Sequence, residues 1–117
     1  MKADPIMKAI KSALDDKKAE DIITIDVREK TPLMDYHVIC TASNTRKMGA
    51  IKEEVEKQIE LANGRIHHVE GTPESGWILV DAFDIIVHIF SPEERDRIRL
   101  EEIFKPKRVK APKDGVN

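Results

Sequence analysis

Residues 76–90 read GWILVDAFDIIVHIF, two apolar runs on either side of a short segment that contains Asp81 and Asp84. The runs, Trp77 to Val80 and Ile85 to Phe90, are rich in the β-branched and aromatic residues that favour strands. The short segment between them has the length of a hairpin connection. We therefore predict two strands that pair with each other, and the rest of the fold is built outward from them.

Three further strands are expected upstream of this hairpin. In the run from Ile22 to Val27, β-branched residues alternate with polar ones, as on a strand with one buried face. Tyr36 to Thr41 is nearly continuous in its apolar character, which is typical of a strand covered on both sides. Ile66 to Val69 is the remaining strand candidate, although it contains two histidines.

Three helices are predicted from capping residues and helical spacing. Asp4 before Pro5 is a typical helix start. Ser43, Asn44 and Thr45 are cap candidates for a long helix that Asn63-Gly64 closes, with Gly64 in the left-handed conformation. Ser91-Pro92-Glu93-Glu94 fits the capping-box pattern and predicts a closing helix from Pro92 to about Phe104. The order of elements predicts a single α/β domain, with one mixed sheet of about five strands and three helices.

Length and charge divide the chain into two parts. The 117 residues suffice for one core, which we assign to residues 1–104. Residues 105–117 carry five basic side chains against Asp114, a balance of +4, and leave −6 for the body. An acidic body is a poor general binder of phosphate backbones. With two prolines and few apolar residues, the tail is expected to be flexible. It is either a solubilising end or a short arm that touches nucleic acid.

The chain is expected to be cytoplasmic. Cys40 is the only cysteine, so it cannot form an intramolecular disulfide and suits a reducing compartment. The first residues lack the pattern of a secretory signal, and no stretch approaches the roughly 18 apolar residues of a membrane helix. We predict no membrane association.

Catalytic patterns are mostly missing. The five glycines are scattered, so no glycine-rich loop can bring successive amides onto a phosphate. No predicted strand carries two carboxylates two residues apart, the spacing that puts both on one face for metal-dependent nucleotidyl transfer. Asp81 and Asp84 are three apart and are assigned to turn formation. The alternative is a metal-dependent nucleotide-processing enzyme that uses Asp26, Asp81 and Asp84 around magnesium.

The histidines and serines receive structural roles. His67 and His68 are adjacent, so in a strand they point to opposite faces and cannot hold one metal ion. A zinc site from His37, His88 and Cys40 requires a coincidence of the fold. Ser43 and Ser91 stand at helix starts without the glycine-flanked elbow of a nucleophile. We predict no catalytic residues, no metal and no cofactor.

Trp77 has two interpretations that the sequence leaves open. It follows a turn-rich loop and opens a strand, so it is either a core or sheet-edge residue or an anchor for a partner, a role in which tryptophan is enriched. On a strand, Leu79 and Asp81 lie on the same face as Trp77. That face would offer an apolar patch with a polar margin.

The chain resembles the Iojap-related family of ribosome-silencing factors from about Ala13 to Phe104. The resemblance rests on several short segments. No single segment is specific, but the order and spacing of these segments together are specific. The segments that carry the resemblance are Asp21-Ile22-Ile23, Asp26-Val27, residues 35–43 (DYHVICTAS) with Arg46, Glu70-Gly71, residues 76–81, residues 84–90, Arg95, Leu100 and Glu101.

The chain departs from the family pattern at three places. Ala82-Phe83 replaces a glycine-containing turn, Arg97-Ile98 replaces an aromatic pair, and Phe104 stands for a tryptophan. These changes affect contact side chains more than the fold pattern. The basic tail lies outside the resemblance.

The resemblance implies a nucleotidyltransferase-like α/β fold without the catalytic carboxylates. It implies a translational repressor, not an enzyme, that binds the large ribosomal subunit through large-subunit protein fourteen and sterically blocks the small subunit under nutrient limitation. By carry-over, the partner-binding residues are Trp77, Leu79, Asp81 and Ile98, the last at the position of a family aromatic. The tail could contact ribosomal RNA at the periphery, and a homodimer is compatible with the family.

Overall fold

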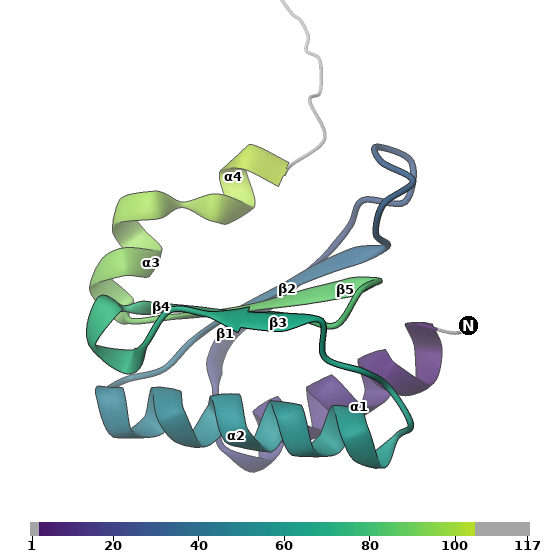
Figure 1. Cartoon of the computed structure of the whole chain (residues 1–117). Helices are drawn as coiled ribbons and strands as arrows, with labels where there is room; N and C mark the ends of the chain where they lie inside the picture. Colours follow the sequence, from purple (N-terminus) through teal and green to yellow (C-terminus); the bar gives the residue numbers. More distant parts are fainter. Residues whose placement is uncertain (1–2, 105–117) are drawn as a thin grey trace, which may run out of the picture.

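A single five-stranded sheet organises the protein, whose structure, a computed structural model, describes residues 3–104 (Figure 1). The elements are α1 (Ala3–Asp16), β1 (Glu20–Asp26), β2 (Tyr36–Thr41), α2 (Thr45–Leu61), β3 (His68–Glu70), the 3-10 turn η1 (Pro73–Ser75), β4 (Trp77–Asp81), β5 (Ile85–Phe90), α3 (Pro92–Ile98) and α4 (Leu100–Phe104). The strand order is β1-β2-β5-β4-β3. Only β2 and β5 run parallel, and the other neighbours are antiparallel. The predicted mixed α/β sheet and the β4–β5 hairpin are confirmed.

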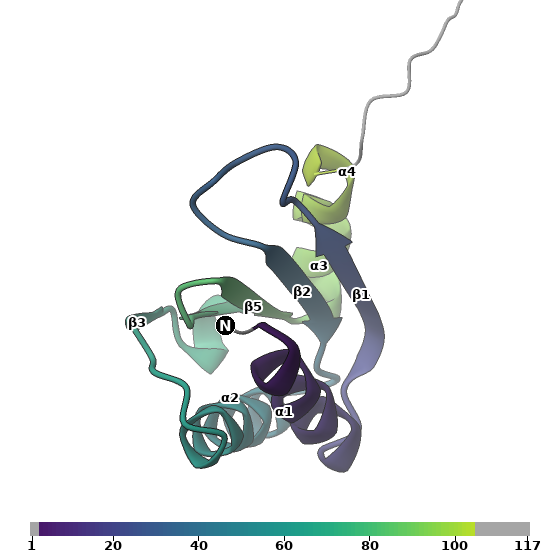
Figure 2. The ribbon, with the colours of Figure 1, turned by 90° about the vertical axis from the view of Figure 1, so that its right-hand side faces the viewer.

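Two helices, α1 and α2, cover one face of the sheet. Both lie on the same side of the strands in the two ribbon views (Figures 1 and 2). Their apolar stripes, including Leu14 and Ile51, pack against inward residues of the central strands such as Val38, Val80 and Val87, all fully buried. This face holds the main core because alternate strand residues and one stripe of each helix point into it.

A smaller cluster lies on the opposite face, under the C-terminal helices. Ile39, Phe90 and Leu100 form its buried centre. Ile39 and Phe90 come from β2 and β5, and alternate residues of the same strands, such as Val38 and Val87, point into the main core. The two central strands are therefore covered on both sides, as the continuous apolar run of β2 predicts.

The closing helix is not continuous, which corrects the predicted single helix from Pro92 to Phe104. Arg99 adopts a left-handed conformation (φ 51°) and separates α3 from α4. The break turns Leu100 into the smaller cluster. Arg95 bridges it, since its guanidinium contacts Glu101 at 3.2 Å and donates to the Thr41 hydroxyl at 2.8 Å. Tertiary contacts of this kind override a helical pattern read locally.

The predicted capping box at the start of α3 is only half formed. Ser91 Oγ accepts from the amide of Glu94 at 3.2 Å, as expected. The Ser91 amide donates to the Gly76 carbonyl at 2.9 Å, so it is not available to the Glu94 side chain. Glu94 pairs with Arg97 instead, at 2.7 Å. The hydrogen bond from Ser91 to Gly76 ties the residue before Trp77 to the start of α3.

The end of α2 also differs in detail from the prediction. Asn63, and not Gly64, takes the left-handed conformation (φ 67°). Gly64 is needed for space, because a Cβ there would lie 2.6 Å from Cδ1 of Ile6 and 2.9 Å from Cγ2 of Ile59. At the other end, Asn44 is the cap among the three candidates, and its side chain accepts from Lys47.

Strand and helix limits shift by a few residues at the periphery. β3 covers His68–Glu70, not Ile66 to Val69, and β1 begins two residues earlier than expected, at Glu20. α1 begins at Ala3, one residue before the predicted cap. Within residues 3–104, no helix is long and apolar enough to cross a membrane. The predicted tail, residues 105–117, lies outside the described residues.

Candidate functional site

The face of β3 and β4 that points away from α1 and α2 is the candidate site, and we call it the open sheet face. It carries Trp77, Leu79 and Asp81 of β4, which are half-buried and alternate with the buried Ile78 and Val80. The exposed His68 and Glu70 of β3 stand directly opposite Asp81 and Leu79. Cross-strand partners share a face, so these side chains form one continuous surface.

The indole of Trp77 is held by a chain of hydrogen bonds across three strands. Its Nε1 donates to Nδ1 of His88 at 3.2 Å, and Nε2 of His88 lies 2.9 Å from Nδ1 of His37. An indole N–H can only donate, so Nδ1 of His88 accepts and its proton resides on Nε2. That proton then points at Nδ1 of His37. These two hydrogen bonds fix the orientation of the Trp77 ring and the tautomer of His88.

Protonating either histidine would break this chain. An added proton on Nδ1 of His88 would face the indole N–H, and one on Nδ1 of His37 would face the N–H of His88. The pKa of His88 is lowered to about 3, mainly by burial and to a smaller extent by the neighbouring His37. Burial also lowers the pKa of His37. Both imidazoles are therefore neutral near pH 7, and the Trp77 ring keeps its orientation.

Trp77 also packs on the smaller apolar cluster. Its ring centroid lies 4.9 Å from that of Phe90, and Ile98 packs against the same cluster. Trp77 therefore packs as a residue of the fold, and its role as an anchor for a partner stays a prediction. One part of its surface belongs to a cluster of the fold, and the half-buried remainder belongs to the open sheet face. The indole nitrogen, the only polar atom of this side chain, already donates a hydrogen bond to His88.

The structure places the four predicted partner-binding residues on one side of the sheet. Trp77, Leu79 and Asp81 share the open sheet face, while Ile98 reaches the margin of that side from the end of α3. Whether they contact a partner remains a prediction. The contact between His88 and His37 was not anticipated, because the parallel pairing of β2 with β5 joins residues 51 positions apart and leaves no local pattern.

The three aspartates of the alternative enzyme hypothesis do not converge, and two of them have local partners. Asp26 pairs with Arg28 at 2.6 Å. Asp81 Oδ1 accepts from the amide of Phe83 at 2.9 Å, the turn role expected for it. Among residues 3–104, these three carboxylates do not form a group close enough to share a metal ion.

Cys40 likewise does not join His37 and His88. It points into the main core with Val38, whereas the two histidines lie on the opposite face of the same strands. Burial raises the pKa of the Cys40 thiol to about 12, which suits an inert apolar side chain.

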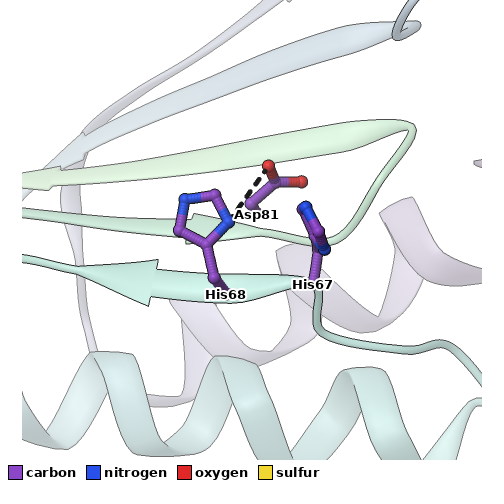
Figure 3. A group of neighbouring side chains, drawn as sticks. All are labelled: His67, His68 and Asp81. Atoms are coloured by element: carbon purple, nitrogen blue, oxygen red, sulfur yellow. Dashed lines mark ion pairs between the residues drawn. The ribbon is translucent and has the colours of Figure 1, made fainter.

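His67, His68 and Asp81 form an unexpected group (Figure 3). The prediction that the two histidines point to opposite faces is wrong, because β3 begins at His68 and the alternation of a strand does not extend to His67. The His67 amide donates to the Asp81 carbonyl at 2.7 Å, and the two imidazole centroids are 5.0 Å apart, nearly perpendicular. Adjacent side chains can therefore converge here.

Phe83 occupies the turn where the resemblance led us to expect a glycine. Its φ of 71° lies in the left-handed region, which explains why glycine suits this turn. Phe83 is 43% exposed, and its ring centroid is 5.0 Å from that of His67. The substitution thus adds an aromatic surface beside the His67 group.

Comparison with known protein families gives a match over nearly the whole chain. The family described as ribosomal silencing factor during starvation matches residues 1–116. This range includes the basic tail, so the expectation that the tail lies outside the resemblance is wrong.

Individual relatives and a solved structure agree with this match. The ribosomal silencing factor RsfS of Zymomonas mobilis is 35% identical over 99 residues, 85% of this chain and 74% of that protein. The chloroplastic protein Iojap of Zea mays is 29% identical, over 82% of this chain and 42% of its own length. In Mus musculus, the mitochondrial assembly of ribosomal large subunit protein 1 is 27% identical, over 80% of this chain and 42% of its own length. The crystal structure of protein CV0518 from Chromobacterium violaceum superposes with a TM-score of 0.85 at 30% identity, covering 94% of this chain and 92% of that one.

Proposed function

Since the chain belongs to the ribosomal silencing factors, a family with a translation-silencing role at the ribosome, we propose that it binds the large subunit and keeps the small subunit from joining. Translation would then fall when nutrients are limiting. Such a mechanism requires affinity and bulk but no bond making. RsfS is named for silencing and not for a reaction.

Two considerations favour the large subunit as the target. The mouse relative is named for the assembly of the ribosomal large subunit. The Iojap-related resemblance also implies large-subunit protein fourteen, on the surface that receives the small subunit. A protein of this size bound to that surface would occupy space that the small subunit needs. We therefore assign the primary contact to protein fourteen.

The open sheet face is the proposed contact surface, and the fixed Trp77 ring is the observation that carries this assignment. The ring is half-buried, and its orientation is set by His88 and Phe90 before any partner arrives. A preorganised aromatic side chain loses little conformational freedom on binding, so more of its contact energy appears as affinity. Leu79 continues the apolar surface, and Asp81 supplies the polar margin.

The basic tail has a supporting role in this proposal. Residues 105–117 carry +4 in net charge, opposite in sign to the body. Ribosomal RNA near protein fourteen would attract these side chains, and the attraction would weaken as salt rises. The tail would add affinity at the periphery, while the open sheet face would define the site.

Co-sedimentation with separated ribosomal subunits tests the contact surface. We expect wild-type protein to co-sediment with the large subunit alone. Trp77→Ala should lose about 2 kcal/mol or more of binding free energy, roughly 30-fold in Kd, if Trp77 is a central anchor. Leu79→Ala should also weaken binding.

Leu61→Ala supplies the matched control for Leu79→Ala. Leu61 is 68% exposed at the end of α2, on the helical side of the sheet, so its truncation should leave binding unchanged. Denaturant unfolding of each variant identifies any loss that comes from the fold itself. Equal binding by wild-type protein and folded Trp77→Ala and Leu79→Ala variants would contradict the assignment of this face.

A further inference from the structure

We propose that His67, His68 and Asp81 bind a divalent transition-metal ion of the Zn²⁺ class at the edge of the open sheet face. One ligand atom from each residue, an imidazole nitrogen or a carboxylate oxygen, lies within 4.8 Å of the other two. Figure 3 shows the two imidazoles on either side of the Asp81 carboxylate. Imidazole nitrogens with one carboxylate oxygen are a ligand set that Zn²⁺ uses in open sites.

The group can close onto an ion with small side-chain movements. Metal–ligand bonds of about 2.0–2.2 Å require ligand atoms to approach somewhat closer to one another than they do here. His67 and His68 are exposed, so their side chains can rotate. Nδ1 of His68 already lies 3.6 Å from Oδ2 of Asp81. Three protein ligands leave a fourth position for water or for a group on another molecule.

A carboxylate behind His68 supports this assignment independently of the ligand distances. Nε2 of His68 lies 2.8 Å from the Glu70 carboxylate. With the ring proton held on Nε2 by Glu70, the lone pair of Nδ1 points toward Asp81. Metal-binding histidines commonly donate their second N–H to a carboxylate in this way, which fixes the tautomer that can bind.

The other two ligands are also oriented by neighbours. Asp81 Oδ1 accepts from the Phe83 amide at 2.9 Å, so Oδ2 is the oxygen that faces His68. The Phe83 ring lies beside the His67 imidazole, and the Arg65 guanidinium lies 5.5 Å from the centroid of Phe83. The turn and the strand edge thus hold all three side chains near one point. Imidazole ligands select Zn²⁺, Ni²⁺ or Cu²⁺ over Mg²⁺.

The test is a Zn²⁺ titration of the full chain, with any polyhistidine tag removed, in competition with a chromophoric chelator. We expect one saturable site. His68→Gln and Asp81→Asn should each weaken binding at least about 10-fold, and Glu70→Gln should weaken it by about 10-fold through loss of the orienting carboxylate. Asp84→Asn is the matched control, because Asp84 is an exposed aspartate outside the group. It should leave the affinity unchanged.

Imidazole ¹⁵N NMR identifies the bound nitrogens in the same samples. On addition of Zn²⁺, the ring signals of His67 and His68 should shift, while those of the buried His37 and His88 should stay in place. The proposal is overturned by no saturable binding, by equal affinity of wild-type protein and Asp81→Asn, or by shifts confined to His37 and His88. None of these results bears on ribosome binding, which is measured separately in magnesium buffer without added Zn²⁺.

Discussion

Trp77 shows how a single side chain can serve both the fold and a surface. Its Nε1–H donates a hydrogen bond to His88, and its ring packs on Phe90. What it offers to a partner is therefore an apolar surface in a fixed position. Sequence reasoning located the residue and its strand neighbours Leu79 and Asp81, because alternation along a strand is local. His88 lies in the predicted hairpin, but the approach of His37 to His88 depends on the strand order, which local patterns do not contain.

The buried histidines give the protein a defined response to acid. The pKa of His88 falls from an ordinary 6.5 to about 3 in the folded state. The unfolded chain therefore binds protons more readily, and unfolding becomes more favourable as pH falls. The stabilising contribution is complete above pH 6.5 and is lost progressively toward pH 3. The slope approaches about 1.4 kcal/mol per pH unit for each such histidine.

Denaturant unfolding between pH 7.5 and pH 4.5 checks this prediction. Wild-type protein should lose stability across that range, and the slope should be smaller in His88→Gln. Glutamine has no titrating group and retains an acceptor for the Trp77 indole. An identical slope in the two proteins would show that His88 is not the group responsible.

At the scale of elements, local patterns predicted the central hairpin well and the periphery less well. β5 covers Ile85–Phe90 as expected, because an apolar run bounded by turn residues has few alternative structures. β3 begins two residues later than predicted, because its three residues are held by pairing with β4 and not by an apolar pattern of their own. The break at Arg99 was also missed, because contacts of Arg95 and Leu100 with distant residues determine it.

Two glycines provide a matched test of how the elements are joined. Gly71 has φ of 88°, and a Cβ there would lie 2.0 Å from the Trp77 carbonyl oxygen. Gly71→Ala should therefore lower the free energy of unfolding by more than about 2 kcal/mol. Gly49 lies within α2, and its added Cβ would meet only Pro73 at 3.9 Å. Gly49→Ala should raise stability by about 0.5–1 kcal/mol.

Thermal or denaturant unfolding of the two alanine variants measures both effects. The opposite signs are the essential result, since each variant adds one methyl group to a glycine. A Gly71→Ala protein as stable as wild type would contradict the close approach of Gly71 to the Trp77 carbonyl.

At the scale of the whole molecule, the two sides of the sheet have different tasks. One side is closed by α1 and α2 and contains the main core. The other is only partly covered by α3 and α4, which leaves Trp77, Leu79 and Asp81 accessible on the open sheet face. The separation means that residues of the open sheet face can be changed while the main core remains intact. The fold and family were predictable from ordered segments along the chain, but the position of the His67 group depended on an irregular strand edge.

Subunit joining measures the central claim most directly. Separated small and large ribosomal subunits are mixed at a magnesium concentration that favours association, and joining is followed by light scattering with increasing amounts of the protein. We predict that saturating protein suppresses joining, and that folded Trp77→Ala requires a higher concentration for the same effect, whereas Leu61→Ala matches wild type. Undisturbed joining at saturating excess of the wild-type protein would contradict the account.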